Sequence, residues 1–442
     1  MKVLFIYHSK DLVNSRTLRF APLTHPLLAA YVPADIEVSI IDESFEEIDF
    51  DQEVDLVAAT IIVPQAPRAY EVAREFRKRG KTVLCGGPHA TLMPQEAAQH
   101  FDSVVIGQGD LTWPLALSDF KQGKLQQFYT SPNEINMENI PFARRDLLNP
   151  KGYSVLNAMQ ATRGCPFSCT FCTTRTIYPK FATMPVKRVI REIDQLEGGP
   201  LQRKIFLFLD DNLMADPVWA KKLFQEVVPL RKIWMGQTTF SITKDRELVK
   251  LASRSGCRLL FLGLESFNSF SLRDCNKTHN TVETYKDGIK LLHDHGISVW
   301  AGIMFGFDDD KKDIFEITLE NCIQLGIDIV GPNIVVPYPG TAFFESLDRA
   351  NRIIHTDWAR YDGKHTVFRP NHMTPEELEE GRNWFNWQFN SFYSILKRSW
   401  ISKTTPWFTL PVNLSKHRIC NSHVPEAKRK GKVSSLSTFP MS

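Results

Sequence analysis

The periodicity of hydrophobic and polar positions predicts two successive α/β units. Before residue 125, five short runs are apolar nearly throughout: 2–8, 37–42, 56–63, 82–87 and 103–107. Such runs are typical of parallel strands buried on both faces. Between the third and fourth runs, Tyr70, Ala73 and Phe76 recur at helical spacing. Strands alternating with helices predict a doubly wound, Rossmann-like (flavodoxin-like) domain over residues 1–125.

A second series of alternating elements follows a polar stretch rich in Pro and Asn, residues 126–153, which we interpret as a linker. Six more strands are predicted at 155–162, 204–210, 233–242, 258–265, 298–305 and 328–335. Helical patterns separate these strands. Six βα repeats fit a partial (β/α)6 TIM barrel over residues 154–340, whose active site belongs at the carboxyl ends of the strands.

The C-terminal part of the chain has a different pattern. Residues 341–400 are predicted to form a helical, aromatic cap. Within it, Thr374-Pro375-Glu376-Glu377 combines an N-cap residue, a proline at the first helical position and a glutamate three residues after the cap, which predicts a helix over 374–396. Ser, Lys and Pro dominate after 401, so we expect residues 401–442 to form a partly disordered tail.

Composition narrows the class of protein. The 442 residues are 43% hydrophobic and 23% charged, with a formal charge of +3. The proportions of hydrophobic and charged residues are those of a globular protein. Positive and negative charges are too nearly balanced to indicate a nucleic-acid partner. No apolar run approaches the roughly 20 residues that span a bilayer, and the first residues read as a strand, not as a signal peptide. We therefore expect a cytoplasmic protein without a membrane span, its eight cysteines being reduced thiols or metal ligands.

Three cysteines crowd into one short loop after the first predicted barrel strand. Cys165, Cys169 and Cys172 have the spacing C-x3-C-x2-C. Three thiolates can hold three irons of a [4Fe–4S] cluster and leave the fourth iron open, whereas ferredoxin clusters use four cysteines. A closed zinc site needs four ligands, and no fourth Cys or His lies nearby in the sequence. Zinc and inert core thiols remain the alternatives.

This loop, with Phe171 before its last cysteine, resembles the signature of the radical S-adenosylmethionine (SAM) superfamily, and the resemblance covers roughly residues 150–340. It implies that SAM chelates the open iron. One electron, from a donor such as flavodoxin or ferredoxin, then generates a 5′-deoxyadenosyl radical that removes hydrogen from a substrate. The residues expected to contact SAM are Phe171, Asp210, Asp211, Gln237, Thr239, Glu265, Gly302 and Gly306. Helix capping is the alternative role for the acidic residues.

The stretches 86–98 and 104–110, followed by the cysteine loop, resemble the cobalamin-binding subclass of these enzymes. The first βα turn has no G-x-G-x-x-G, which argues against a dinucleotide site. Glycines at strand ends would allow a flat corrin to approach the backbone. Because D-x-H-x-x-G is absent, we expect cobalt without a protein histidine below it; a domain that has lost cobalamin is the alternative. The predicted cobalamin-binding residues are His8, Ser9, Gln65, Gly86, Gly87, Pro88, His89, Gly107, Gly109 and Asp110.

The resemblance implies an enzyme, and the main functional hypothesis is a methyltransferase that acts on an unactivated carbon through the radical and methylcobalamin. A radical cyclase or rearrangement enzyme, resembling the anaerobic tetrapyrrole ring cyclases, is one alternative. A cobalamin- or redox-responsive binding protein is another. The aromatic C-terminal region favours a sizeable, partly apolar small-molecule substrate. Tyr338, Tyr361 and His365 are predicted to line its pocket.

Overall fold

The computed structural model describes residues 1–8, 19–132, 136–404 and 406–422. The front domain contains one parallel sheet with the strand order β2-β1-β3-β4-β5-β6. Because the order reverses beside β1, this is the flavodoxin-like arrangement, whose ligand site lies beyond the carboxyl ends of the strands. Its strands are β1 (Lys2–Tyr7), β2 (Glu37–Asp42), β3 (Leu56–Thr60), β4 (Thr82–Gly86), β5 (Ser103–Ile106) and β6 (Phe128–Thr130).

Helices cover both faces of the front sheet because successive strand residues point to opposite sides. Val3, Phe5 and Leu84 pack against one group of helices, while Leu4 and Ile6 belong to the other face. The helices are α1 (Thr24–Ala29), α2 (Ala66–Lys78), α3 (Pro88–Leu92), α4 (Pro94–His100) and α5 (Gly109–Lys121). The five predicted strands are confirmed. The structure adds β6, which lies inside the segment interpreted as a linker, so that part of the segment belongs to the sheet.

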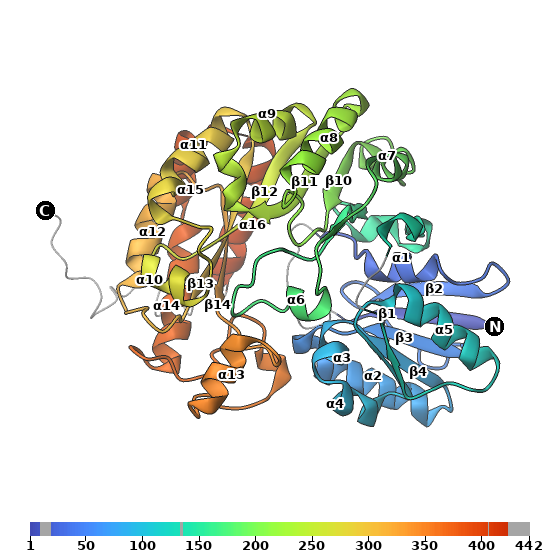
Figure 1. The fold of residues 1–442 in the computed structure, drawn as a ribbon. Helices are drawn as coiled ribbons and strands as arrows, with labels where there is room; N and C mark the ends of the chain where they lie inside the picture. Colours follow the sequence, from blue (N-terminus) through green and yellow to red (C-terminus); the bar gives the residue numbers. More distant parts are fainter. Residues whose placement is uncertain (9–18, 133–135, 405, 423–442) are drawn as a thin grey trace, which may run out of the picture.

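The second domain is a six-stranded parallel sheet in the order β14-β13-β12-β11-β10-β7. It curves into an open partial barrel with helices on its outer side (Figure 1), as the six predicted repeats require. The strands are β7 (Asn157–Met159), β10 (Ile205–Phe208), β11 (Ile233–Thr239), β12 (Cys257–Glu265), β13 (Ser298–Phe305) and β14 (Ile329–Ile334). The outer helices are α7 (Val186–Asp194), α8 (Pro217–Val227), α9 (Arg246–Arg254), α11 (Tyr285–Asp294) and α12 (Ile314–Gln324).

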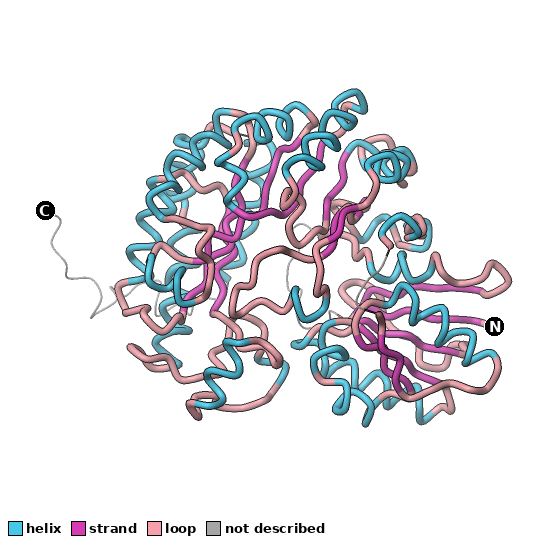
Figure 2. Tube along the Cα trace, viewed as in Figure 1, coloured by secondary structure: helices cyan, strands magenta, loops and turns pink. Residues whose placement is uncertain are grey.

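Between the domains, the chain makes short irregular elements before the barrel continues (Figure 2). β8 (Thr162–Arg163) and β9 (Ala182–Thr183) form a small antiparallel pair that brackets the cysteine loop, and α6 (Thr174–Ile177) follows the last cysteine of that loop. The loop is thus held at the junction of the two sheets.

The C-terminal segment is more ordered than its composition predicts. α14 (Pro375–Phe389) begins with the expected capping box of Thr374 and Glu377, but it ends before Ser391, whose side chain caps α15 (Phe392–Ser402). The single predicted helix is therefore two helices. α13 (Ala342–Arg349) precedes them, and the short α10 (Ser269–Asp274) belongs to the barrel.

Residues 406–422, expected to be part of an irregular tail, form the helix α16 (Pro406–Ser422). This expectation is wrong because apolar residues within the segment have a partner far away in the sequence. Val412 is 7% exposed and packs with Met235, Leu259 and Ile329 on the barrel face that points away from the outer helices. Within the described residues, no helix is both long enough and apolar enough to cross a membrane.

We predict that Val412→Asp destabilises the protein by about 3 kcal/mol or more, because it places an unpaired charge in a packed apolar cluster. Thermal unfolding of the purified chain would show this as a lower midpoint. Arg418→Gln, at an exposed position of the same helix, is the control and should leave the midpoint unchanged. Equal midpoints for the two variants would contradict the packing of α16 against the barrel.

Candidate active site

A cavity of about 470 Å³ opens at the carboxyl ends of the front strands. Its wall does not stop at the front domain, because Gln160, Arg163, Thr174 and Asp211 from the barrel side also line it. A pocket of this size at a domain boundary is typical of a cofactor or ligand site. Seven of the residues predicted to bind cobalamin lie in its lining: Gln65, Gly86, Gly87, Pro88, Gly107, Gly109 and Asp110.

Two glycines in this lining are required by the conformation of the backbone and by close neighbours. Gly87 and Gly107 have φ of +93° and +82°, values that other residues rarely adopt. A Cβ on Gly87 would lie 2.7 Å from Thr60 Cγ2, and one on Gly107 would lie 2.4 Å from Ser131 Oγ. Both turns therefore need glycine to form the cavity rim, whatever ligand binds there.

The three other predicted cobalamin contacts have a different placement. His8 is 1% exposed, with its Nδ1 2.8 Å from Glu43 Oε2. His89 is fully buried; the hydroxyl of Tyr70 lies 2.7 Å from its Nε2, and burial lowers its pKa to about 4. Neither histidine is among the residues that line the cavity. Ser9 lies outside the described residues.

The cysteine loop runs along the mouth of the barrel. Cys165 and Cys169 are half-buried, Cys172 is exposed, and all three are free thiols. Burial raises the pKa of Cys169 to about 11, with smaller contributions from Glu265 and from the other two thiols. A thiol so disfavoured as an anion ionises more readily beside a cation: the charge of Lys277 lowers this pKa in part, and bound iron would supply more positive charge.

The acidic run after β10 anchors this loop. Asp210 is 2% exposed, and its Oδ1 accepts hydrogen bonds from the amide of Ala161 and from both the amide and the hydroxyl of Thr162. Asp211 Oδ2 accepts from the amide of Gly164 at 3.2 Å. Burial raises the pKa of Asp210 to about 7. Both carboxyls thus hold the loop in place, and the predicted SAM contacts of Asp210 and Asp211 stay predictions.

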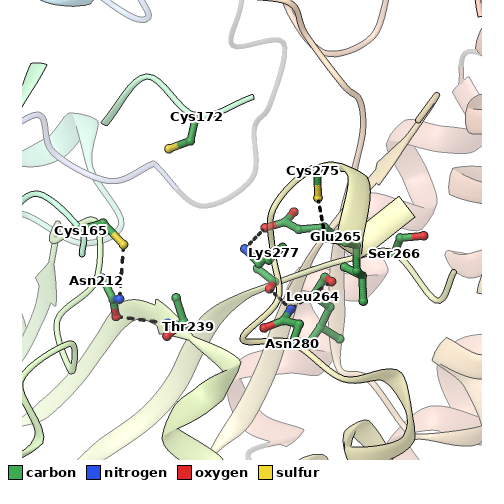
Figure 3. A network of polar contacts seen from close by, with 12 residues as sticks. Cys165, Cys172, Asn212, Thr239, Leu264, Glu265, Ser266, Cys275, Lys277 and Asn280 are labelled. Atoms are coloured by element: carbon green, nitrogen blue, oxygen red, sulfur yellow. Dashed lines mark hydrogen bonds and ion pairs between the residues drawn. The ribbon is translucent and has the colours of Figure 1, made fainter. Parts of the chain in front are cut away.

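Asn212 is a site residue that the sequence analysis did not single out. Its Nδ2 lies 3.5 Å from Cys165 Sγ, while its Oδ1 accepts from Thr238 Oγ1 at 2.9 Å and from the amide of Thr239 at 3.3 Å (Figure 3). Asn212 therefore connects a cysteine to the end of β11. Its position directly after Asp210-Asp211, at a strand end, was the signal that could have found it.

Across the barrel mouth from Asn212, Glu265 ends β12 in an unusual conformation. Its φ is +65°, and the pairing with β13 shifts register between Gly263 and Glu265. Non-glycine residues held in this region are strained and cluster at functional sites. Glu265 Oε1 lies 2.5 Å from Nζ of Lys277, which is 5% exposed (Figure 3). The sequence analysis did not predict this buried partner.

Three glycines face one another across neighbouring strands just below Glu265. Gly263 pairs with Gly302, and Gly302 pairs with Gly331. The rings of Phe261 and Trp300 lie beside this row: a Cβ on Gly302 would be 2.9 Å from Phe261 Cζ, and one on Gly331 would be 3.3 Å from Trp300 Nε1. The glycines therefore make room for side chains of the protein itself: Phe261 lies in front of Gly302, Trp300 in front of Gly331, and the pair of Glu265 and Lys277 in front of Gly263.

The remaining predicted SAM contacts occupy this region with varied roles. Gln237 is exposed on β11 and donates to the carbonyl of Asp211 at 3.3 Å, and the hydroxyl of Thr239 pairs with Ser241. Phe171 packs toward Phe307, with ring centroids 6.2 Å apart. Gly306 has φ of +98° and makes the turn after β13.

The residues predicted to line a substrate pocket are Tyr338, Tyr361 and His365, and the structure contradicts this prediction for Tyr361. Tyr361 has no exposed surface, donates its hydroxyl to the carbonyl of His355 at 2.9 Å, and packs against Trp358. It therefore belongs to the core and not to an open pocket, which corrects the prediction. Tyr338 donates to the carbonyl of Tyr361, and His365 pairs with Asp362.

A buried ion pair connects the cavity at the carboxyl ends of the front strands to the cysteine loop. The guanidinium of Arg163, two residues before Cys165, contacts Asp110 through Nη1 at 2.5 Å and Nη2 at 3.0 Å. Gln108 and Gln160 accept further hydrogen bonds from the same guanidinium. A bidentate pair of this kind fixes geometry as well as charge.

Comparisons with known proteins agree with this architecture. A profile of the Radical SAM superfamily matches residues 159–320, and a B12 binding domain profile matches residues 10–117. Bacteriochlorophyllide d C-12(1)-methyltransferase of Chlorobaculum tepidum is 31% identical over 420 residues, which cover 92% of this chain and 90% of that protein. Bacteriochlorophyllide d C-8(2)-methyltransferase of the same organism is 29% identical, over 80% of this chain and 82% of that protein.

More distant proteins share the layout. An anaerobic magnesium-protoporphyrin IX monomethyl ester cyclase of Rubrivivax gelatinosus is 26% identical over 86% of this chain and 75% of that protein. The solved structure of the radical SAM methyltransferase TsrM from Kitasatospora setae, with cobalamin and a [4Fe-4S] cluster bound, superimposes with a TM-score of 0.63 at 16% identity. The match covers 88% of this chain and 85% of that chain.

The chain belongs to the cobalamin-binding radical SAM enzymes. Its cofactors are a [4Fe–4S] cluster, SAM and cobalamin, and the residues present fit them: three free thiols on one loop for the cluster, and a cavity shared by both domains for cobalamin. The predictions of an enzyme and of this fold are confirmed. The individual contacts to SAM and cobalamin stay predictions.

We predict that three cysteines, not four, hold the cluster. Cys275 is buried close to the loop: its carbonyl accepts from the amide of Thr170 at 3.0 Å, and burial raises the pKa of its thiol to about 12. Cys275→Ala should therefore keep about four irons per chain after anaerobic reconstitution, whereas Cys165→Ala, Cys169→Ala and Cys172→Ala should each lose the intact cluster. Iron analysis with an absorption spectrum tests this, and loss of iron from Cys275→Ala would contradict it.

We also predict that Glu265 acts in SAM binding and not only in folding. Glu265→Ala should lower the unfolding midpoint, because it leaves Lys277 buried without its partner, at a cost of about 3 kcal/mol. The double variant Glu265→Gln/Lys277→Met should restore the midpoint, yet both variants should bind SAM about tenfold more weakly. Equilibrium dialysis against labelled SAM and iron analysis measure the two effects. Wild-type SAM affinity in the double variant would reduce Glu265 to a structural role.

Proposed function

We propose that this enzyme transfers a methyl group to an unactivated carbon of a tetrapyrrole macrocycle. One observation carries the methylation: the cavity at the front strand ends is lined by residues of the cysteine loop and its anchor, among them Arg163 and Asp211. When bound, the cluster and SAM supply hydrogen abstraction and cobalamin supplies the methyl group. A cavity lined by both domains would allow both groups to reach the same substrate atom.

The residues of the chain hold the reacting groups in position and exclude water. Asp210 and Asp211 fix the start of the cysteine loop through its amides, and Asn212 extends that contact to Cys165. The pair of Arg163 with Asp110 keeps this loop at a fixed place relative to the front strand ends. Such preorganisation matters because a shift of one ångström between reacting groups can lower a rate by about a hundredfold.

The substrate class rests on the relatives of this chain. Both of the bacteriochlorophyllide methyltransferases described above act on a tetrapyrrole and match this chain along most of its length. A protein electron donor, such as flavodoxin or ferredoxin, would reduce the cluster.

Methylation can be measured with SAM that carries a deuterated methyl group and with bacteriochlorophyllide d as the acceptor. The expected product contains one additional CD3 group, and Cys165→Ala should form neither this product nor 5′-deoxyadenosine. Gly86→Phe, which places a ring in the front cavity, should still form 5′-deoxyadenosine but transfer no methyl; Gly86→Ala is its control. Release of an unmethylated product with a new ring would instead establish the cyclase alternative.

A further inference from the structure

Helix α15 has the reverse of the polarity expected for a surface helix. Its inward face carries three buried polar residues, Ser394, Arg398 and Ser402, beside one buried apolar residue, Ile395. The guanidinium of Arg398 donates to the carbonyls of Ile327 and Asp328 at 2.8 and 2.7 Å. A helix of this kind is held to the barrel mainly by hydrogen bonds and not by an apolar stripe.

The outward face of the same helix is apolar and exposed. With 3.6 residues per turn, Phe392, Leu396 and Trp400 align in one row, and Tyr393 lies next to it. Trp400 is 78% exposed, Tyr393 70%, Leu396 67% and Phe392 56%. Neighbouring large apolar residues exposed to this degree mark an interaction surface.

We propose that this face of α15 docks on the surface of a bilayer that contains anionic phospholipid, with the helix parallel to the membrane plane. Tryptophan and tyrosine are the side chains that favour the boundary between headgroups and acyl chains. Nζ of Lys397 lies 5.7 Å from the ring centroid of Tyr393, and Nζ of Lys403 lies 5.8 Å from that of Trp400. Each lysine can thus reach headgroup phosphates while its aromatic neighbour inserts.

The positive charge of the C-terminal segment favours an anionic membrane over a second copy of this chain as the partner. Residues 391–442 contain nine Lys and Arg against one Glu, although the whole chain carries only +3, so the rest of the chain is net negative. Two of the nine, Arg398 and Lys416, donate to carbonyls of the barrel, whereas Lys397, Lys403 and Arg418 are exposed. Two copies that met through this segment would bring like charges together, whereas an anionic membrane attracts it, at about 1 kcal/mol for each basic residue near the surface.

Vesicle flotation with the reconstituted full chain tests the proposal. Phosphatidylcholine vesicles that contain phosphatidylglycerol should carry the protein upward, and vesicles of phosphatidylcholine alone should carry much less. High salt should weaken the binding, because charge attraction is screened. The binding of Leu396→Gln/Trp400→Ser to the anionic vesicles should be weaker than that of the wild type by a factor of about ten or more. The matched control is Phe270→Ser, which removes an aromatic residue that is 61% exposed on α10 and should bind as the wild type does.

A spectroscopic measurement places the contact at α15. Brominated acyl chains should quench part of the tryptophan fluorescence of the wild type, and Trp400→Phe should lose that part while it still floats with vesicles. The proposal is overturned if the wild type does not float with anionic vesicles, or if Leu396→Gln/Trp400→Ser floats as the wild type does. It is also overturned if the wild type is a dimer that Leu396→Gln/Trp400→Ser converts to a monomer, because a second copy then covers this face. None of these readouts depends on the identity of the methyl acceptor.

Discussion

The ion pair between Arg163 and Asp110 is the contact on which the geometry of this enzyme depends. Asp110 lies in the first turn of α5, at the end of a front strand, and Arg163 lies two residues before the first cluster cysteine. Both side chains are nearly buried, at 7% and 6% exposure, so neither charge can be left without its partner at low cost. The pair therefore joins the two sheets at the wall of the cavity that they share.

Around that pair, the protein fixes its loops mainly with carboxylates and backbone amides. Asp210 and Asp211 each hold amides of the segment that leads into the cysteines. These bonds use backbone amides and not the cysteine sulfurs. Asp210 makes them through Oδ1 alone, and its buried Oδ2 has no hydrogen-bond partner among the described residues.

The fold and the metal loop could be predicted from sequence because their signals are local. Periodicity identified every strand of the two six-stranded sheets except β6, and three cysteines in eight residues identified the loop. The errors concern contacts between distant residues. His89 lies at a strand end, as a ligand would, yet Tyr70 and Glu96 enclose it together with Trp358, more than 250 positions later in the chain. Lys277, the partner of Glu265, and the docking of α16 depend on the same kind of long-range contact.

The open barrel explains why the C-terminal helices are built as they are. β14 is an edge strand, and an uncovered edge leaves backbone carbonyls without partners. Basic side chains from the C-terminal helices donate to those carbonyls: Lys416 to Val330 at 2.8 Å and Arg382 to Pro332 at 3.0 Å, while Arg398 serves the residues just before the strand. The inward polarity of α15 thus follows from the edge that it covers. Covering that edge does not require the opposite face of the helix to be aromatic. The row of Phe392, Leu396 and Trp400 therefore has no role in packing α15 against the barrel, which agrees with its proposed role as a docking surface.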